Sequence, residues 1–180
     1  MHPFRSLVAL ILVTALVSAA VANPADFSVS PVAVPFRLSD ARGKYVAVHF
    51  LLKTECPVCL RHVHAYATRG PAELPDVVQV FLKPDADAEI AAWAGKLPPT
   101  NGPRPTIYCD PDAQLAKAFG IPGGYRFHGQ VVHYPALVLI GPDGKEVFRH
   151  VGKDNADRFS FDALKAKVAD LKSKASAAKP

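Results

Sequence analysis

The chain has 180 residues, of which 49% are hydrophobic and 21% are charged, so it suits one globular domain and is too short for two comfortable ones. The formal net charge is +5, with basic residues spread over many positions. No aromatic residues interleave with the lysines that crowd the C-terminus, as a nucleic-acid platform would require, so we expect no nucleic-acid partner.

The N-terminal segment has the pattern of an export signal. Arg5 precedes an apolar run over residues 7 to 17, and Ala20-Val21-Ala22 follows as a small-x-small cleavage site. The apolar run is short for a bilayer span, and no cysteine follows it as a lipoprotein anchor would need. We therefore expect residues 1 to 22 to be a signal peptide, no stable membrane anchor, and a periplasmic or secreted mature protein.

The mature chain begins with an entry segment over residues 23 to 44, in which apolar residues alternate between positions 32 and 38 before a turn. Residues 45 to 52 are nearly all apolar, which is typical of a central strand buried on both faces. His49 lies inside this strand, and we interpret it as a packed core histidine rather than a ligand.

Two cysteines follow that strand in the sequence Cys56-Pro57-Val58-Cys59, where the strand gives way to a helix predicted over residues 57 to 69. A thiolate at the first turn of a helix is stabilised by the positive end of the helix dipole and by unpaired backbone N–H groups. Pro57 suits the first helical position, where its missing N–H costs nothing. Two intervening residues bring Cys59 within disulfide reach of Cys56, so this stretch predicts a redox site.

Helical phase separates the roles of the two thiols. Cys59, Val63 and Tyr66 fall on one apolar stripe of the helix, whereas Cys56 lies at its tip, which we expect to be exposed. We therefore expect Cys56 to attack and Cys59 to resolve. A C-x-x-C pair could also be half of a zinc site or a structural disulfide, but the chain has no second C-x-x-C and no H-x-x-x-H to complete a zinc site.

The middle of the chain alternates strands and helices. Residues 77 to 82 predict a strand, Asp85 opens a helix, residues 106 to 109 predict a short strand, and Asp110-Pro111-Asp112 caps a helix that stops at Gly120. This alternation predicts an α/β fold with helices on both faces of the sheet. Cys109 ends a strand, so it is either a third thiol near the redox pair or a small buried residue.

The last third predicts an antiparallel end to the sheet. Residues 131 to 140 form a strand interrupted by Pro135, residues 141 to 144 a hairpin turn, and residues 145 to 151 the partner strand. A proline inside a strand pattern indicates an edge, a bulge or a cis bond. A closing helix follows, and residues 173 to 180 are expected to be a disordered basic tail, which leaves residues 23 to 172 as the domain.

These features together resemble the thioredoxin fold, namely the element order, the thiol pair at a strand-to-helix junction, and Tyr134-Pro135 before a hairpin strand. Residues 50 to 59 read F-x-x-x-x-x-C-P-x-C and are similar to the redoxin, or AhpC/TSA-like, branch of that superfamily. The resemblance implies a central mixed sheet flanked by helices, and a redox pair at Cys56 and Cys59. It also implies that Pro135 is a cis-proline whose loop, with Tyr134 and Pro57, binds a thiol substrate.

The resemblance implies a thiol-disulfide oxidoreductase with no organic cofactor. Its partners would be a protein or small-molecule thiol or disulfide and a redox partner protein. A peroxiredoxin-like peroxidase with Cys59 as peroxidatic cysteine is the alternative. Typical peroxiredoxins place Thr or Ser three residues before that cysteine and Pro four before that. Those positions are Cys56 and Leu52 when Cys59 is aligned, or Lys53 and His49 when Cys56 is aligned. Neither register preserves the peroxide-binding pattern.

A third hypothesis is copper binding, because exported thioredoxin-fold copper chaperones combine a cysteine pair with a distal histidine. His133 lies near the Pro135 loop in the sequence, and thiolates with an imidazole suit copper. Those chaperones resemble C-x-x-x-C, whereas this chain has C-x-x-C. We therefore expect no bound metal.

Overall fold

The computed structural model describes residues 26–29, 35–53, 55–100 and 102–177. The predicted signal peptide and the last three residues of the predicted tail lie outside these ranges. Within them, no helix combines the length and the apolar character needed to cross a membrane.

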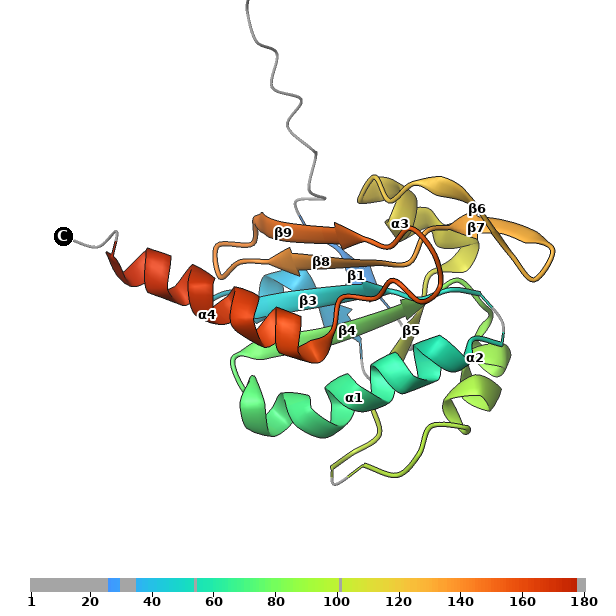
Figure 1. The fold of residues 1–180 in the computed structure, drawn as a ribbon, viewed down its shortest axis with the longest axis horizontal. Helices are drawn as coiled ribbons and strands as arrows, with labels where there is room; N and C mark the ends of the chain where they lie inside the picture. The colour runs from blue at the N-terminus through green and yellow to red at the C-terminus, as the bar shows by residue number, and fades with distance from the viewer. Residues whose placement is uncertain (1–25, 30–34, 54, 101, 178–180) are drawn as a thin grey trace, which may run out of the picture.

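A five-stranded mixed sheet forms the centre of the molecule (Figure 1). Its strand order is β5-β4-β3-β8-β9. The strands are β3 (Tyr45–Phe50), β4 (Val77–Lys83), β5 (Ile107–Cys109), β8 (Ala136–Ile140) and β9 (Glu146–Val151). The first three run parallel, and β8 is antiparallel to both β3 and β9. Every residue of β3 is buried, as predicted for a central strand.

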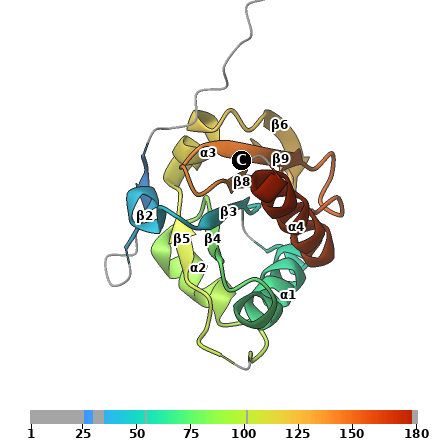
Figure 2. The same cartoon turned by 90° about the vertical axis from the view of Figure 1, so that its left-hand side faces the viewer.

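Helices cover both faces of this sheet, which confirms the predicted α/β architecture (Figure 2). Alternate residues of β3 pack into two hydrophobic cores, one on each face of the sheet, since successive side chains of a strand point to opposite faces. Tyr45 and Ala47 pack with α1 (Pro57–Glu73), α2 (Asp87–Ala94) and α4 (Phe161–Ala177). Val46 and Val48 pack with η1 (Leu38–Ala41) and α3 (Gln114–Ala118), which follows the short helix η2 (Pro111–Ala113).

The predicted strand over residues 131 to 140 is wrong, because it is two strands of different sheets. β7 (Gln130–His133) pairs with β6 (Gly123–Phe127) in a separate hairpin, which the sequence analysis missed, and β8 belongs to the central sheet. A second small sheet pairs β1 (Ser28–Val29) with β2 (Phe36–Arg37). Proline explains the break, since it supplies no N–H to a continuous ladder.

The expected cis bond before Pro135 is also wrong, because all peptide bonds of the described residues are trans. Hydrogen bonds hold the chain extended on both sides of this bond. The Tyr134 N–H donates to the carbonyl of Pro122, and the Pro135 carbonyl accepts from the Gly152 N–H, each at 2.8 Å. Pro135 thus stands just before β8, where its missing N–H removes no ladder bond.

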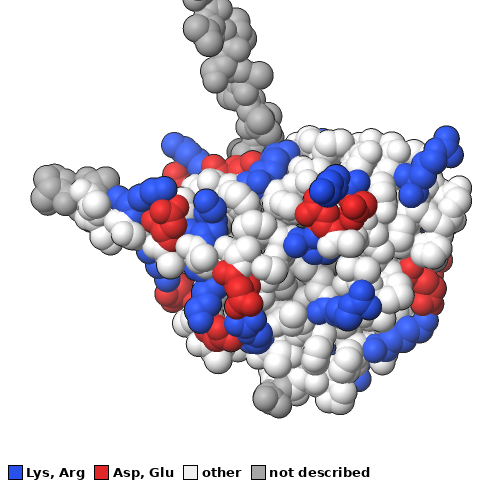
Figure 3. Space-filling view, in the orientation of Figure 1, with Lys and Arg blue, Asp and Glu red and all other residues white. Residues whose placement is uncertain are grey.

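The closing helix extends beyond the predicted domain end. Residues 173 to 177 were expected to be disordered, yet α4 continues to Ala177. Ion pairs accompany this extension, with Lys172 at 2.9 Å from Asp76 and Lys174 at 2.9 Å from Asp170. Figure 3 shows basic and acidic side chains interspersed around this helix, so the basic residues here do not form one continuous field on the face shown.

Candidate active site

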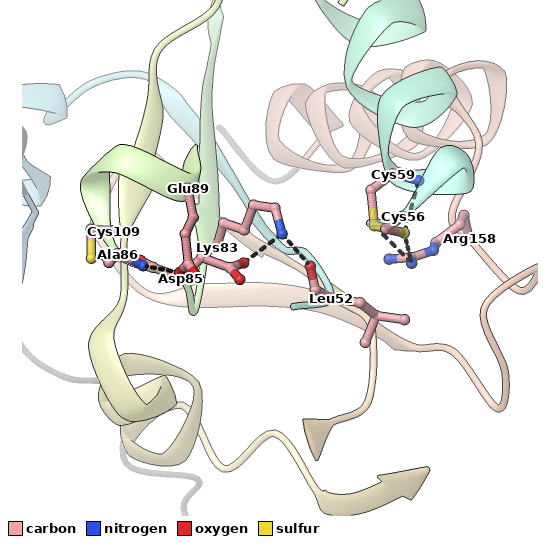
Figure 4. Close-up of polar contacts among 9 residues, drawn as sticks. All are labelled: Leu52, Cys56, Cys59, Lys83, Asp85, Ala86, Glu89, Cys109 and Arg158. Atoms are coloured by element: carbon pink, nitrogen blue, oxygen red, sulfur yellow. Dashed lines mark hydrogen bonds and ion pairs between the residues drawn. A yellow bond between two sulfur atoms is a disulfide. The ribbon is translucent and has the colours of Figure 1, made fainter. Parts of the chain in front are cut away.

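The two cysteines of the C-x-x-C motif form a disulfide at the N-terminus of α1, with a Cα–Cα distance of 5.2 Å (Figure 4). Cys56 is the N-cap residue, and Pro57 is the first residue of the helix. The backbone N–H of Cys59 donates to Cys56 Sγ at 3.1 Å. This N–H has no intrahelical acceptor, because it lies in the first turn. It is therefore available to stabilise a thiolate on Cys56 after reduction.

Both cysteines are buried, which contradicts the expectation that Cys56 is exposed. Cys56 is 1% exposed and Cys59 is 0% exposed. The cause is the loop between β9 and α4, whose Asn155 Oδ1 lies 3.5 Å from Cys56 Sγ. Helical phase alone could not predict this cover. The predicted inward stripe of Cys59, Val63 and Tyr66 is confirmed, as all three are buried.

Arg158 from the same loop contacts both sulfurs and was not identified from the sequence. Its Nη2 lies 3.3 Å from Cys59 Sγ and 3.7 Å from Cys56 Sγ. Two hydrogen bonds to Asn155 fix the guanidinium, one to the side-chain oxygen at 2.7 Å and one to the carbonyl at 3.1 Å. Burial lowers the pKa of Arg158 to about 10, so the group remains positively charged at neutral pH. It therefore supplies a cation to a thiolate on either cysteine.

A pair of histidines links the helix that carries the cysteines to the central sheet, with His62 on α1 and His49 on β3. His49, correctly predicted to be a core residue, is fully buried, and its Nδ1 lies 2.9 Å from His62 Nε2. Its Nε2 lies 2.9 Å from Gln79 Oε1. Burial lowers the pKa of His49 to about 4 and holds the pKa of His62 well below its usual value, and the charge of Arg158 acts in the same direction. Both imidazoles are therefore neutral at pH 7.

The residues predicted to bind substrate lie in different environments. Pro57 is exposed, and Tyr134 is partly exposed with its ring 5.2 Å from that of Tyr125. Pro135 is buried and lines a cavity of about 10 Å³ together with His62 and Arg158. Pro135 and Arg158 thus line the same cavity, and Arg158 in turn contacts both sulfurs of the redox pair.

Cys109 is a free cysteine on β5 and does not join the redox pair. Its Sγ donates to the carbonyl of Asp85 at 3.0 Å, and burial raises the pKa of this thiol. In Figure 4 it lies on the far side of Lys83 from the disulfide. The interpretation as a small buried residue therefore fits its position better than that of a third redox thiol, and the structure shows that this burial is partial.

His133, the candidate copper ligand, has a structural partner instead. It is 6% exposed, its Nδ1 donates to the carbonyl of Tyr134 at 2.7 Å, and its ring packs edge-on against Phe50. Burial lowers its pKa. Across the part of the chain that the structure describes, no three His, Cys, Asp or Glu side chains gather as a metal site. The arrangement of these side chains therefore gives no support to the copper hypothesis.

A buried ion pair that no local sequence pattern predicts supports the segment that leads to the cysteines. Lys83 and Asp85, whose side chains are each 1% exposed, lie 2.5 Å apart. Lys83 Nζ also donates to the carbonyl of Leu52 at 3.0 Å, as Figure 4 shows. This bond ties the end of β4 to the chain four residues before Cys56. It helps to fix the position from which α1 begins.

Comparison with known proteins identifies the family. The model of the AhpC/TSA family matches residues 21–147. The chain belongs to the AhpC/TSA family. A Haemophilus influenzae protein named as a peroxiredoxin, bcp, is 30% identical over 94 residues, which make up 52% of this chain. The match covers 58% of that relative, so the chain spans less than two thirds of its length.

Solved structures of two kinds share this fold. The bacterioferritin comigratory protein of Xanthomonas campestris, which has alkyl peroxide reduction activity, matches with a TM-score of 0.66 and 17% identity, over 81% of this chain and 90% of that one. A Chlorobium tepidum protein named as a thiol:disulfide interchange protein, DsbE, matches with a TM-score of 0.59 and 21% identity, over 81% and 92%. The expected thioredoxin-like redoxin fold is confirmed. Together with the family, the disulfide supports a thiol-dependent redox enzyme.

Proposed function

We propose that this AhpC/TSA-family protein is an exported thiol-disulfide oxidoreductase that uses Cys56 and Cys59. The observation that carries the proposal is the disulfide at the helix N-terminus with Arg158 against both sulfurs. A backbone N–H and a guanidinium lower the pKa of a thiol, and the thiolate is the form that attacks disulfides. The pair is thus placed to exchange electrons with a substrate disulfide or dithiol.

The reduced pair reacts in two steps. The Cys56 thiolate, held by the Cys59 N–H, attacks a substrate disulfide, and a mixed disulfide forms while one substrate thiolate leaves. The Cys59 thiol then loses its proton and attacks Cys56 Sγ, which forms the intramolecular disulfide and releases the second substrate thiol. The same steps run in reverse when the oxidised pair accepts electrons from a substrate dithiol. A redox partner protein resets the pair after each cycle.

Substrate access involves the surface around the helix tip. Pro57 and the partly exposed Tyr134 are proposed to contact the thiol substrate, and Pro135 lines the small cavity that Arg158 also lines. Because Asn155 covers Cys56 Sγ, a substrate must displace this side chain to attack. Asp154 and Ala156 on either side of it are exposed, so Asn155 lies in a surface loop.

Two single substitutions test the order of the thiols. Cys59→Ser should accumulate a mixed disulfide on Cys56 when treated with a small disulfide, because no second thiol resolves it. Cys56→Ser should trap almost no adduct. Mass spectrometry of the two proteins gives the answer, and an adduct found only on Cys59 of the Cys56→Ser protein would reverse the assignment.

A peroxiredoxin-like activity is the second candidate, with Cys59 as the attacking thiol. It is favoured by the position of Arg158 Nη2, which is closer to Cys59 Sγ than to Cys56 Sγ. We expect slow peroxide consumption and faster reduction of a protein disulfide such as those of insulin. Rapid peroxide turnover that persists in the Cys56→Ser protein would establish the peroxidase in place of the oxidoreductase.

Export is tested separately from the chemistry. Expression of the full chain should yield a protein that lacks residues 1 to 22 in the periplasm or the medium. The mass of the purified protein identifies the cleavage position. Accumulation of the uncleaved chain in the cytoplasm would contradict export and would leave the thiol chemistry untouched.

A further inference from the structure

The hydrogen bonds around His49 define which nitrogens carry protons. The Gln79 amide nitrogen donates to the Val77 carbonyl at 3.4 Å, which turns its oxygen toward His49 Nε2. An amide oxygen only accepts, so His49 Nε2 carries the proton and its Nδ1 does not. His62 Nε2 must then donate to His49 Nδ1. Neutral His62 is left with an unprotonated Nδ1, which has a lone pair and no hydrogen bond to the described residues.

The helix places the His62 ring next to the turn that carries the resolving cysteine. His62 follows Cys59 by three residues on α1, and helical side chains lean toward the N-terminus, so His62 lies over the turn that carries the disulfide. Arg158 lies beside both His62 and Cys59. It lines a cavity of about 10 Å³ together with His62, and it contacts Cys59 Sγ at 3.3 Å. A cavity of this volume is about the size of one water molecule, which suffices to pass a proton.

We propose that the His62–His49 pair accepts the proton of Cys59 when Cys59 resolves the mixed disulfide. The inference rests on the proposed function and assigns the base of its second step. The S–H bond of Cys59 breaks, the proton goes to His62 Nδ1, and the sulfur electron pair forms the bond to Cys56 Sγ. The bond between Cys56 and the substrate sulfur breaks, and the departing thiolate takes up the proton. A substrate disulfide has then become one thiolate, released in the first step, and one thiol, while the protein pair has become a disulfide.

The charges around the histidines make this transfer specific to the resolving step. Burial and the charge of Arg158 keep both imidazoles neutral, so the lone pair is available beforehand. Gln79 on β4 carries no charge, and Tyr66 on α1 donates its hydroxyl to the Phe159 carbonyl at 2.8 Å and has a raised pKa. His150 on β9 and Asp157 in the loop after it line the same cavity as His62, and they pair with each other at 3.1 Å. A thiolate forming on Cys59 adds the negative charge that favours a protonated His62.

A chromogenic aromatic disulfide releases one coloured thiolate in each step of the reaction. Its use as the substrate therefore separates the reaction of Cys56 from that of Cys59. The first phase reports attack by Cys56, and the second reports resolution by Cys59. In His62→Gln the side-chain amide can still donate to His49 but offers no base. We expect an unchanged first phase and a second phase about tenfold or more slower at pH 7. The difference should shrink at alkaline pH, where Cys59 ionises without a base.

Two further variants separate a proton-transfer role from a packing role. His64→Gln changes a histidine on the same helix outside the pair and should leave both phases unchanged. Gln79→Glu places a carboxylate beside His49 Nε2–H, which raises the basicity of the pair and should shift the second phase to lower pH. Gln79 also lines a cavity of about 350 Å³, so the new charge is hydrated rather than fully buried. A packing role predicts no such shift.

The outcomes distinguish the inference from the function on which it rests. If the wild-type protein has no second phase, the oxidoreductase proposal fails. If the wild type resolves and His62→Gln matches its rate at every pH, only the histidine proposal is overturned. Should His62→Gln fail to fold, the Gln79→Glu protein decides, because an unchanged pH profile there contradicts the proposal.

Discussion

The charge of Arg158 should set the acidity of the attacking thiol. An opposite charge within about 4 to 6 Å lowers a pKa by roughly 1 to 3. Arg158→Met keeps much of the side-chain volume and removes the charge, so we expect the pKa of the Cys56 thiol to rise by about 1 to 2. Ultraviolet absorbance of the thiolate, followed across pH on the reduced protein, measures the change.

Arg37→Met is the matched control for this prediction. Arg37 is exposed on β2, outside the central sheet, so its loss should leave the thiol pKa unchanged. An equal rise in both variants would show that net charge acts on the thiol at long range. The contact with Arg158 would then not be the cause.

Residues with a local pattern were predictable, and those brought in by the fold were not. The spacing of Cys56 and Cys59 after a buried strand predicted a redox pair, because strand, helix start and thiol order are all local features. Arg158 lies 99 residues beyond Cys59 and belongs to no recognisable motif. His62 has no local signal for a role, because its partner His49 lies on another element.

At the scale of elements, the hydrogen bonds from the start of α3 to the Asp110 side chain provide a test of stability. Asp110, predicted as part of a helix cap, is 4% exposed and accepts from the N–H groups of Leu115 at 2.8 Å and Ala116 at 3.0 Å. Asp110→Ala leaves both donors unpaired in a buried place, so we expect a loss of about 1 to 2 kcal/mol in the free energy of unfolding. Urea unfolding measures this loss.

Asp40→Ala is the control for the cap, because Asp40 is an exposed aspartate of the short helix η1 and makes no side-chain hydrogen bond to the described residues. It should change the stability by only a few tenths of a kcal/mol. Equal losses in the two variants would mean that the two hydrogen bonds of Asp110 contribute nothing beyond those of a surface carboxylate.

The elements with strong hydrophobic patterns were predicted well, and the β6–β7 hairpin was not. β6 contains Gly123, Gly124 and Arg126, so it lacks the alternation that marks a half-buried strand. The turn after β6 is marked by Gly129 in the sequence. His128 and Gly129 both have positive φ, as a tight hairpin turn requires. Without β6, the apolar residues of β7 and β8 read as one strand across Pro135.

At the scale of the whole molecule, three distant parts of the chain meet at one end of the sheet. The start of α1 supplies the thiols, the loop after β9 supplies Arg158 and Asn155, and the link between β7 and β8 supplies Pro135. The order of strands and helices fixed the fold class in advance, because α/β layers follow from alternation. The cover over the thiols depends on how a loop packs, and no periodic pattern encodes that.

The buried histidines predict that the folded state loses stability in weak acid. The unfolded chain protonates histidine near pH 6.5, whereas His49 in the folded protein has a pKa of about 4. Between these values the unfolded state binds more protons, so stability falls as pH falls. His49 alone should cost about 2 kcal/mol on going from pH 7 to pH 5, and the lowered pKa of His62 adds to this loss.

Carboxylates change the stability in a lower pH range than histidines do, so the two contributions can be measured separately. Glu73, paired with Arg69 and Lys165, has a pKa lowered to about 2, so its contribution is present above about pH 4.5 and is lost below it. Urea unfolding at pH 7, 6 and 5 therefore reports mainly on the histidines. His64→Gln should keep the slope, and His49→Gln should flatten it. A wild-type stability that stays constant from pH 7 to pH 5 would show that the buried histidines take up protons over the same pH range in the folded protein as in the unfolded chain.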